Sequence, residues 1–141
     1  MMHDEKHKQI VRQVVEAVNG NQYGDAIGRL ISPQVIYRHN DKAGGANEWV
    51  TNIRDSRIAF PDSRLTIVSQ TLEGDRLITC YQFTGTHTGP RGEIPPTGKR
   101  VEITGVVTTR LENDMIAELD EQVDEVVLAQ QLGLGDEPPG L

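Results

Sequence analysis

Apolar side chains recur at helical spacing near the start of the chain. They follow one another at intervals of one, three and four residues, at Ile10, Val11, Val14, Val15 and Val18, which aligns them on one face of a helix. A shorter helix is predicted over residues 25–30. Ser32-Pro33 ends it, because proline and the residue before it disfavour helical backbone. The β-branched and aromatic segment 35–37 then predicts a short strand, and residues 41–45 have the composition of a loop.

A third helix is expected from about Ala46 to Ala59, because Trp49, Ile53 and Phe60 fall near helical spacing. After it the pattern changes from helices to strands.

Two segments, 65–69 and 77–86, flank a Gly74-Asp75 turn and predict a hairpin. Segment 88–98 is rich in glycine and proline, which predicts a long loop. Strands are expected over 100–112 and 115–122, joined by Asn113-Asp114, with a short final helix near residues 126–128. Helices followed by an antiparallel sheet predict an α+β layer fold. A curved sheet covered by helices on one side encloses a cavity, where chemistry is expected.

Composition narrows the classes of partner. The 141 residues have the length of one domain, predicted to span residues 1–135 with a mobile tail at 136–141. The net charge of −7 argues against a nucleic-acid partner, which needs a basic face. No segment approaches the ~18 apolar residues of a membrane helix. Cys80 is the single cysteine, which excludes an intramolecular disulfide and a Cys-rich zinc site. The charged start of the chain, without an apolar run, predicts a cytoplasmic location.

Two motifs lie close together in the glycine- and proline-rich region. They read Gly-Thr-His-Thr-Gly at 85–89 and Ile-Pro-Pro-Thr-Gly-Lys-Arg-Val at 94–101. Together with Arg110, Ile-Ala-Glu at 116–118 and Gln-Gln-Leu-Gly at 130–133, they make the chain similar to the SnoaL-like polyketide cyclase family. The resemblance covers about residues 11–133. It implies the cone-shaped, cystatin-like α+β fold of the nuclear transport factor 2-like superfamily, which hosts many activities.

The resemblance also implies a chemistry. Characterised polyketide cyclases of this family catalyse an intramolecular aldol condensation without a metal or organic cofactor, so neither is expected here. In these enzymes an Asp on the last strand is the general acid/base, and a His on the preceding strand assists it. The Asp position falls on Glu121, the His position on Val107, and an Asn near the ligand at about Tyr37. The carboxylate is therefore kept, whereas the imidazole and the amide are replaced.

Strand alternation gives an independent view of Glu121. Alternation predicts which residues share a face within each strand. These are Tyr81, Phe83 and His87 in the first of the three strands, Val101, Ile103, Val107 and Thr109 in the second, and Ala117, Leu119, Glu121 and Val123 in the last. If these faces meet, Glu121 is an acid in a mostly apolar pocket near Tyr81, Phe83 and His87, where burial suits it to proton transfer. The alternative is a solvated surface acid, because Glu121 stands in an acidic run from residue 118 to residue 125.

Other candidates carry two interpretations each. His87 or Tyr37 could donate a hydrogen bond to an oxyanion in the cavity, and His87 could instead fix the neighbouring loop. The apolar stripe of the third helix either lines the cavity or packs in the core. His39 ends a strand near the cavity mouth, where a role in the following loop is expected rather than a catalytic one.

Two functions remain open from the sequence. The first is a cofactor-independent cyclase or isomerase that acts on a small apolar carbonyl compound. Its catalytic residues would be Glu121 and His87, and its substrate-binding residues would be Tyr37, Trp49, Ile53, Phe60, Tyr81, Phe83 and Val107. The second is a cavity protein that binds a hydrophobic ligand without transforming it, which the loss of the His at Val107 favours. A homodimer through the outer sheet face, with Gln82, Glu102, Thr104 and Thr108, is compatible with either function.

Overall fold

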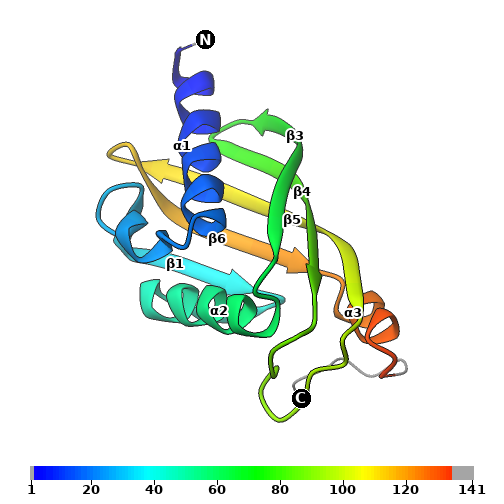
Figure 1. Cartoon of the computed structure of the whole chain (residues 1–141). Coiled ribbons are helices and arrows are strands. Elements are labelled where there is room, and N and C mark those ends of the chain that lie inside the picture. Colours follow the sequence, from blue (N-terminus) through cyan, green and yellow to red (C-terminus); the bar gives the residue numbers. More distant parts are fainter. Residues whose placement is uncertain (1, 135–141) are drawn as a thin grey trace.

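A computed structural model describes residues 2–134 of the chain, so the predicted mobile tail at 136–141 lies outside the described residues. Three α-helices and one short 3₁₀ helix accompany the strands in this range: α1 (Met2–Asn19), η1 (Tyr23–Ala26), α2 (Ala46–Ala59) and α3 (Glu125–Gln131). The strands are β1 (Ile31–His39), β2 (Lys42–Gly44), β3 (Arg64–Glu73), β4 (Arg76–Thr86), β5 (Arg100–Glu112) and β6 (Met115–Val123). They form one sheet in the order β2-β1-β6-β5-β4-β3, which curves around α1 and α2 (Figure 1). None of the helices described is long and apolar enough to cross a membrane.

Local sequence chemistry explains the elements that were predicted correctly. Helix α2 has the predicted bounds, and the Glu48 side chain accepts a hydrogen bond of 2.8 Å from the Gly45 N–H at its start. Strands β5 and β6 meet at Asn113-Asp114, whose φ angles of 53° and 62° are the left-handed values that a tight hairpin turn requires. The predicted α+β architecture is confirmed.

The region between α1 and α2 differs from the prediction. The helix expected over 25–30 is only the 3₁₀ turn η1, and β1 runs straight through Ser32-Pro33. Proline is tolerated there because the pairing of β1 with β6 is irregular between Ile31 and Ile36, so no ladder hydrogen bond from Pro33 is needed. The expected loop at 41–45 contains the short strand β2, which pairs with β1.

The sheet is mixed rather than purely antiparallel, because β1 pairs with β6 in parallel. This pairing places His39 directly beside Glu121. A bulge also changes the predicted alternation of β6. Arg110 pairs with Glu118 and Leu111 with Ile116, so Ala117 is an extra residue. Ala117 therefore lies on the outer face and Ile116 is buried, which corrects the predicted sharing of a face by Ala117 and Glu121.

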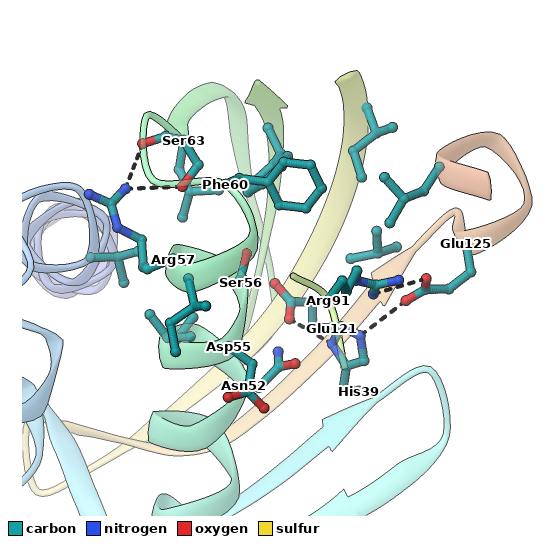
Figure 2. Close-up of a pocket in the computed structure, with 18 of the residues that line it drawn as sticks. His39, Asn52, Asp55, Ser56, Arg57, Phe60, Ser63, Arg91, Glu121 and Glu125 are labelled. Carbon is teal, nitrogen blue, oxygen red and sulfur yellow. Dashed lines mark hydrogen bonds and ion pairs between the residues drawn. The ribbon is translucent and has the colours of Figure 1, made fainter. Parts of the chain in front are cut away.

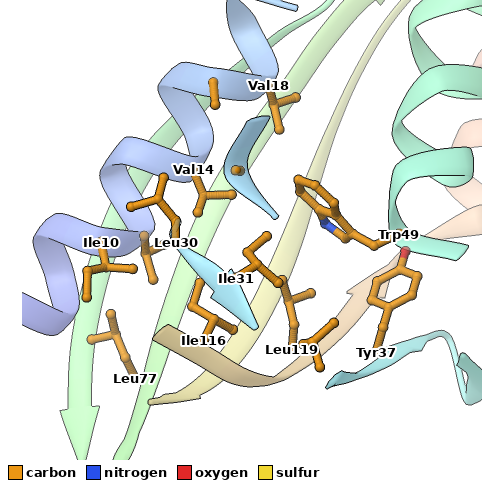
Figure 3. Close-up of a cluster of buried hydrophobic side chains, with 14 residues drawn as sticks. Ile10, Val14, Val18, Leu30, Ile31, Tyr37, Trp49, Leu77, Ile116 and Leu119 are labelled. Atoms are coloured by element: carbon orange, nitrogen blue, oxygen red, sulfur yellow. The ribbon is translucent and has the colours of Figure 1, made fainter. Parts of the chain in front are cut away.

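Two apolar clusters stabilise the fold. The larger packs α1, η1 and α2 against the sheet, and Figure 3 shows its members Ile10, Val14, Val18, Leu30, Ile31, Tyr37, Trp49, Leu77, Ile116 and Leu119. The smaller joins the end of α2 to β5 and α3 through Ala59, Phe60, Val101, Ile103, Leu128 and Leu132. Members of both clusters line one cavity.

Candidate functional site

A cavity of about 780 Å³ lies between α2 and the inner face of the sheet. Its volume is in the range of small-molecule sites. The wall is largely apolar, with Ile53, Phe60, Leu65, Phe83, Ile103, Val123 and Leu128. A cluster of charged side chains, His39, Arg91, Glu121 and Glu125, lies at one end, where β1, β6, α3 and the 88–99 loop between β4 and β5 meet (Figure 2). Other polar side chains line the α2 side of the cavity, among them Asn52, Asp55, Ser56 and Arg57.

Glu121 on β6 is the centre of that polar end. Its side chain is 18% exposed and lines the cavity. The alternative of a solvated surface acid is therefore wrong. The Tyr81 hydroxyl donates to Oε2 at 2.5 Å, and His39 Nδ1 lies 2.9 Å from Oε1. The sequence predicted Glu121 in a mostly apolar pocket near Tyr81, Phe83 and His87. Tyr81 and Phe83 do line the same cavity, and both carboxylate oxygens of Glu121 meet polar groups.

The sheet register brings these three side chains together. His39 on β1 and Val107 on β5 flank Glu121 on its two sides. Tyr81 belongs to β4, one strand further away, and must cross β5 to reach the carboxylate. It crosses at its pairing partner Gly105, where an added Cβ would overlap the Tyr81 ring. Glycine at this position therefore gives Tyr81 access to Glu121.

His39 is a cation at neutral pH. Hydrogen bonds to Glu121 and then Glu125 raise its pKa to about 9, against the opposing effect of burial. Its Nε2 lies 3.6 Å from Glu125 Oε1, and Arg91 lies 3.5 Å from Glu125 Oε2. Burial alone would raise the pKa of Glu125, but His39 and Arg91 together lower it. The result is a row of alternating charges from Glu121 to Arg91, drawn as dashed lines in Figure 2.

Two tyrosines border the same end of the cavity. Burial, followed by the charge of Glu121, raises the pKa of both Tyr37 and Tyr81 well above the ordinary range. Both phenols therefore stay protonated at neutral pH. The hydroxyl oxygen of Tyr37 accepts a hydrogen bond of 2.9 Å from Asn52 Nδ2 on α2.

The structure places most of the sequence-predicted site residues on the cavity: Glu121, Tyr37, Ile53, Phe60, Tyr81 and Phe83. Trp49 and Val107 instead pack in the larger apolar cluster and are absent from the lining.

His87 is also absent from the cavity lining, and its side chain is completely buried. Its Nδ1 accepts from the Thr97 N–H at 3.2 Å and lies 3.0 Å from the Thr97 hydroxyl, so it ties the two ends of the 88–99 loop together. Burial lowers the pKa of His87, which keeps the ring neutral. The structure does not bring His87 into contact with Glu121.

Sequence reasoning placed His39 near the cavity mouth but favoured a loop role for it, and it missed Asn52. His39 was expected to serve a loop, and no local pattern indicated its contact with Glu121, which depends on the parallel pairing of β1 with β6. Asn52 lies one residue before Ile53 on α2, so helical spacing could have placed it beside the same wall. Within residues 2–134, no three His, Cys, Asp or Glu side chains converge as a metal site would require.

Comparisons with known proteins agree with this architecture. The sequence profile of the SnoaL-like polyketide cyclase family matches residues 8–132, whereas no curated protein matches the sequence. The chain is similar to AclR, a proposed hydroxylase from Streptomyces galilaeus, with a TM-score of 0.81 and 26% identity over 92% of this chain and 96% of that one.

Two further solved structures share the fold. A proposed SnoaL-like polyketide cyclase from Jannaschia sp. CCS1 has a TM-score of 0.82 and 19% identity, over 91% of this chain and 92% of that one. IdmH, a proposed polyketide cyclase from Streptomyces antibioticus, has a TM-score of 0.80 and 23% identity, over 89% and 97% of the two chains. These likenesses confirm the predicted cone-shaped fold.

Proposed function

The chain belongs to the SnoaL-like polyketide cyclase family, and from this premise we propose that it is a cofactor-independent enzyme acting on a small apolar carbonyl compound. Glu121 is its general acid/base. One observation carries the proposal: the Glu121 carboxylate lines an otherwise largely apolar cavity and is fixed by two hydrogen-bond partners. A base fixed in this way is pre-oriented for proton transfer to a bound molecule.

The reaction begins with removal of a proton from a carbon next to a carbonyl group. Glu121 takes this proton, the C–H electron pair forms the carbon–carbon double bond of an enolate, and the carbonyl π pair moves to the oxygen. In an aldol cyclisation, the enolate carbon then attacks a second carbonyl of the same molecule, and the new alkoxide takes the proton back from Glu121. In an isomerisation, Glu121 returns the proton to a different carbon. Both outcomes leave Glu121 ready for another cycle.

His39 and Tyr81 orient the base. The family resemblance places the assisting His at Val107, on the β5 side of Glu121. Here an imidazole contacts the same carboxylate from the β1 side at 2.9 Å. This contact supports the view that a carboxylate–imidazole pair is retained with the imidazole on the opposite neighbouring strand. Tyr81 fixes the second oxygen, so the carboxylate cannot rotate away from the cavity.

The proposal is tested with 2-tetralone, a bicyclic ketone with an acidic C–H next to its carbonyl. The protein in D₂O is expected to exchange that hydrogen faster than buffer does, as measured by ¹H NMR. Glu121→Gln removes the base, and the expected loss of rate is about 10²- to 10⁴-fold. Glu102→Gln is the matched control, because Glu102 is an exposed acid on β5 outside the cavity. Equal rates for both variants would overturn the assignment.

A non-catalytic ligand-binding cavity is the second candidate function. It is favoured by the fact that both oxygens of Glu121 already have partners. Tight binding of 2-tetralone, with an exchange rate equal to that of buffer, is the result this function requires. We also propose a homodimer through the outer sheet face and a cytoplasmic location. A monomer mass at micromolar concentration would contradict the dimer.

A further inference from the structure

The two tyrosines at the polar end of the cavity use their hydroxyl groups differently. The Tyr81 hydroxyl donates a hydrogen bond to Glu121. The Tyr37 hydroxyl oxygen instead receives a hydrogen bond from Asn52. Within residues 2–134, the Tyr37 hydroxyl makes this one hydrogen bond and donates none to another protein group. The O–H of Tyr37 is therefore available to donate a hydrogen bond to a bound molecule, whereas the O–H of Tyr81 already donates one to Glu121.

Asn52 controls the direction in which this proton points. A hydroxyl that accepts a hydrogen bond on one side presents its own O–H on another side. Because the amide N–H of Asn52 comes from α2, the O–H of Tyr37 is turned away from the Asn52 nitrogen. Tyr37 and Asn52 both line the cavity, so the remaining space for the proton and its acceptor is the cavity.

Register places this donor near the proposed base. Tyr37 pairs with Leu119 and His39 pairs with Glu121, so Tyr37 and Glu121 are diagonal neighbours on adjacent strands. The rings of Tyr37 and His39 are 6.4 Å apart between centroids. Tyr37 and Glu121 therefore line the same end of the cavity from adjacent strands.

We propose that Tyr37 donates the hydrogen bond that stabilises the enolate oxygen, and that Asn52 is the positioning residue that aims it. This inference rests on the proposed function and deepens it. When Glu121 takes the proton from carbon, negative charge moves to the oxygen facing Tyr37, and the Tyr37 O–H bond stays intact while its hydrogen bond strengthens. The substrate class is an enolisable ketone or β-dicarbonyl compound whose oxygen is on the Tyr37 side. His87, the other donor considered from the sequence, is buried outside the cavity.

The test is a double-mutant cycle on 2-tetralone exchange. Tyr37→Phe keeps the ring in its buried position and removes only the hydroxyl, and the expected loss of rate is about 10²-fold or more. Asn52→Leu is expected to reduce the rate about tenfold in the wild-type background and not at all in the Tyr37→Phe background, because it acts through Tyr37. Asn47→Leu is the matched control, an exposed asparagine on the same helix and outside the cavity. If thermal melting shows that the Asn52→Leu variant is not folded, Asn52→Ala replaces it.

A binding measurement separates this inference from the proposed function. The oxygen of 2-naphthol mimics the enolate oxygen of 2-tetralone, and its fluorescence distinguishes the neutral from the ionised form. The wild-type chain should bind it, and Tyr37→Phe and Asn52→Leu should each bind it more weakly, whereas Glu121→Gln should retain binding. If Glu121→Gln loses exchange but Tyr37→Phe keeps both exchange and binding, the inference fails and the proposed function stands. Equal effects of Asn52→Leu in both backgrounds, or no binding of 2-naphthol to the wild-type chain, also overturn the inference.

Discussion

Protonated His39 should make a large, pH-dependent contribution to stability. Its side chain is only 24% exposed, and its pKa is raised from 6.5 to about 9, mainly by the hydrogen bond to Glu121. At 1.36 kcal/mol per pH unit, this shift corresponds to about 3 kcal/mol of folding free energy. Because the folded state has the higher pKa, the full contribution is present below pH 6.5 and disappears as the pH rises through 9.

The assay compares urea unfolding of the wild-type chain with His39→Asn between about pH 6 and about pH 10. The difference in unfolding free energy between the two proteins should fall by about 3 kcal/mol over this range. His7→Asn is the control of opposite sign. Burial lowers the pKa of His7 from 6.5, so the contribution of His7 should be constant above pH 6.5 and should be lost only as the pH falls below that value. A difference between the wild-type chain and His39→Asn that is constant or grows with pH would refute a charged His39 beside Glu121.

Three further changes test the surroundings of Glu121. Tyr81→Phe removes a hydrogen bond to a charged group, so the free energy of unfolding in urea should fall by about 2 kcal/mol, and an unchanged value would contradict the contact. Gly105→Ala places a methyl group against the Tyr81 ring. It should destabilise the chain by about 1–3 kcal/mol and slow 2-tetralone exchange, and wild-type stability together with a wild-type rate would show that the ring does not cross β5 there. His87→Asn should leave the exchange rate unchanged while amide hydrogen exchange quickens over residues 88–99, and the opposite pattern would restore His87 as a catalytic candidate.

The parts of the fold that could be predicted from the sequence depend on short-range chemistry. Helix α2 follows from apolar spacing, and the turn between β5 and β6 follows from Asn113-Asp114, whose short polar side chains tolerate left-handed backbone. The cavity and the presence of Glu121 on it could also be anticipated, because both follow from alternation on β6 and from the family resemblance. The predicted alternation fails at Ala117, where the bulge lies, but it is regular from Glu118 onward. Glu121 therefore has the predicted orientation.

What the sequence did not reveal depends on contacts between distant strands. His39 and Glu121 are 82 positions apart, and their contact follows from the parallel pairing of β1 with β6 that no local pattern encodes. The reach of Tyr81 across β5 needs both the β4–β5 register and a glycine at position 105. Pro33 was predicted to end a helix, but it lies within β1. It can lie in a strand because the pairing of β1 with β6 is interrupted there, which again depends on a distant strand.

A crystal structure of the chain with bound 2-naphthol would test the central claim, that the cavity presents a carbonyl compound to Glu121, most directly. The rings are expected to lie between Phe60, Phe83 and Ile103, with the naphthol oxygen within hydrogen-bond distance of Tyr37 and the adjacent carbon facing the Glu121 carboxylate. Naphthol bound outside the cavity, or inside it with its oxygen turned away from Tyr37 and its reactive carbon away from Glu121, would show that the cavity does not present a carbonyl compound to this base.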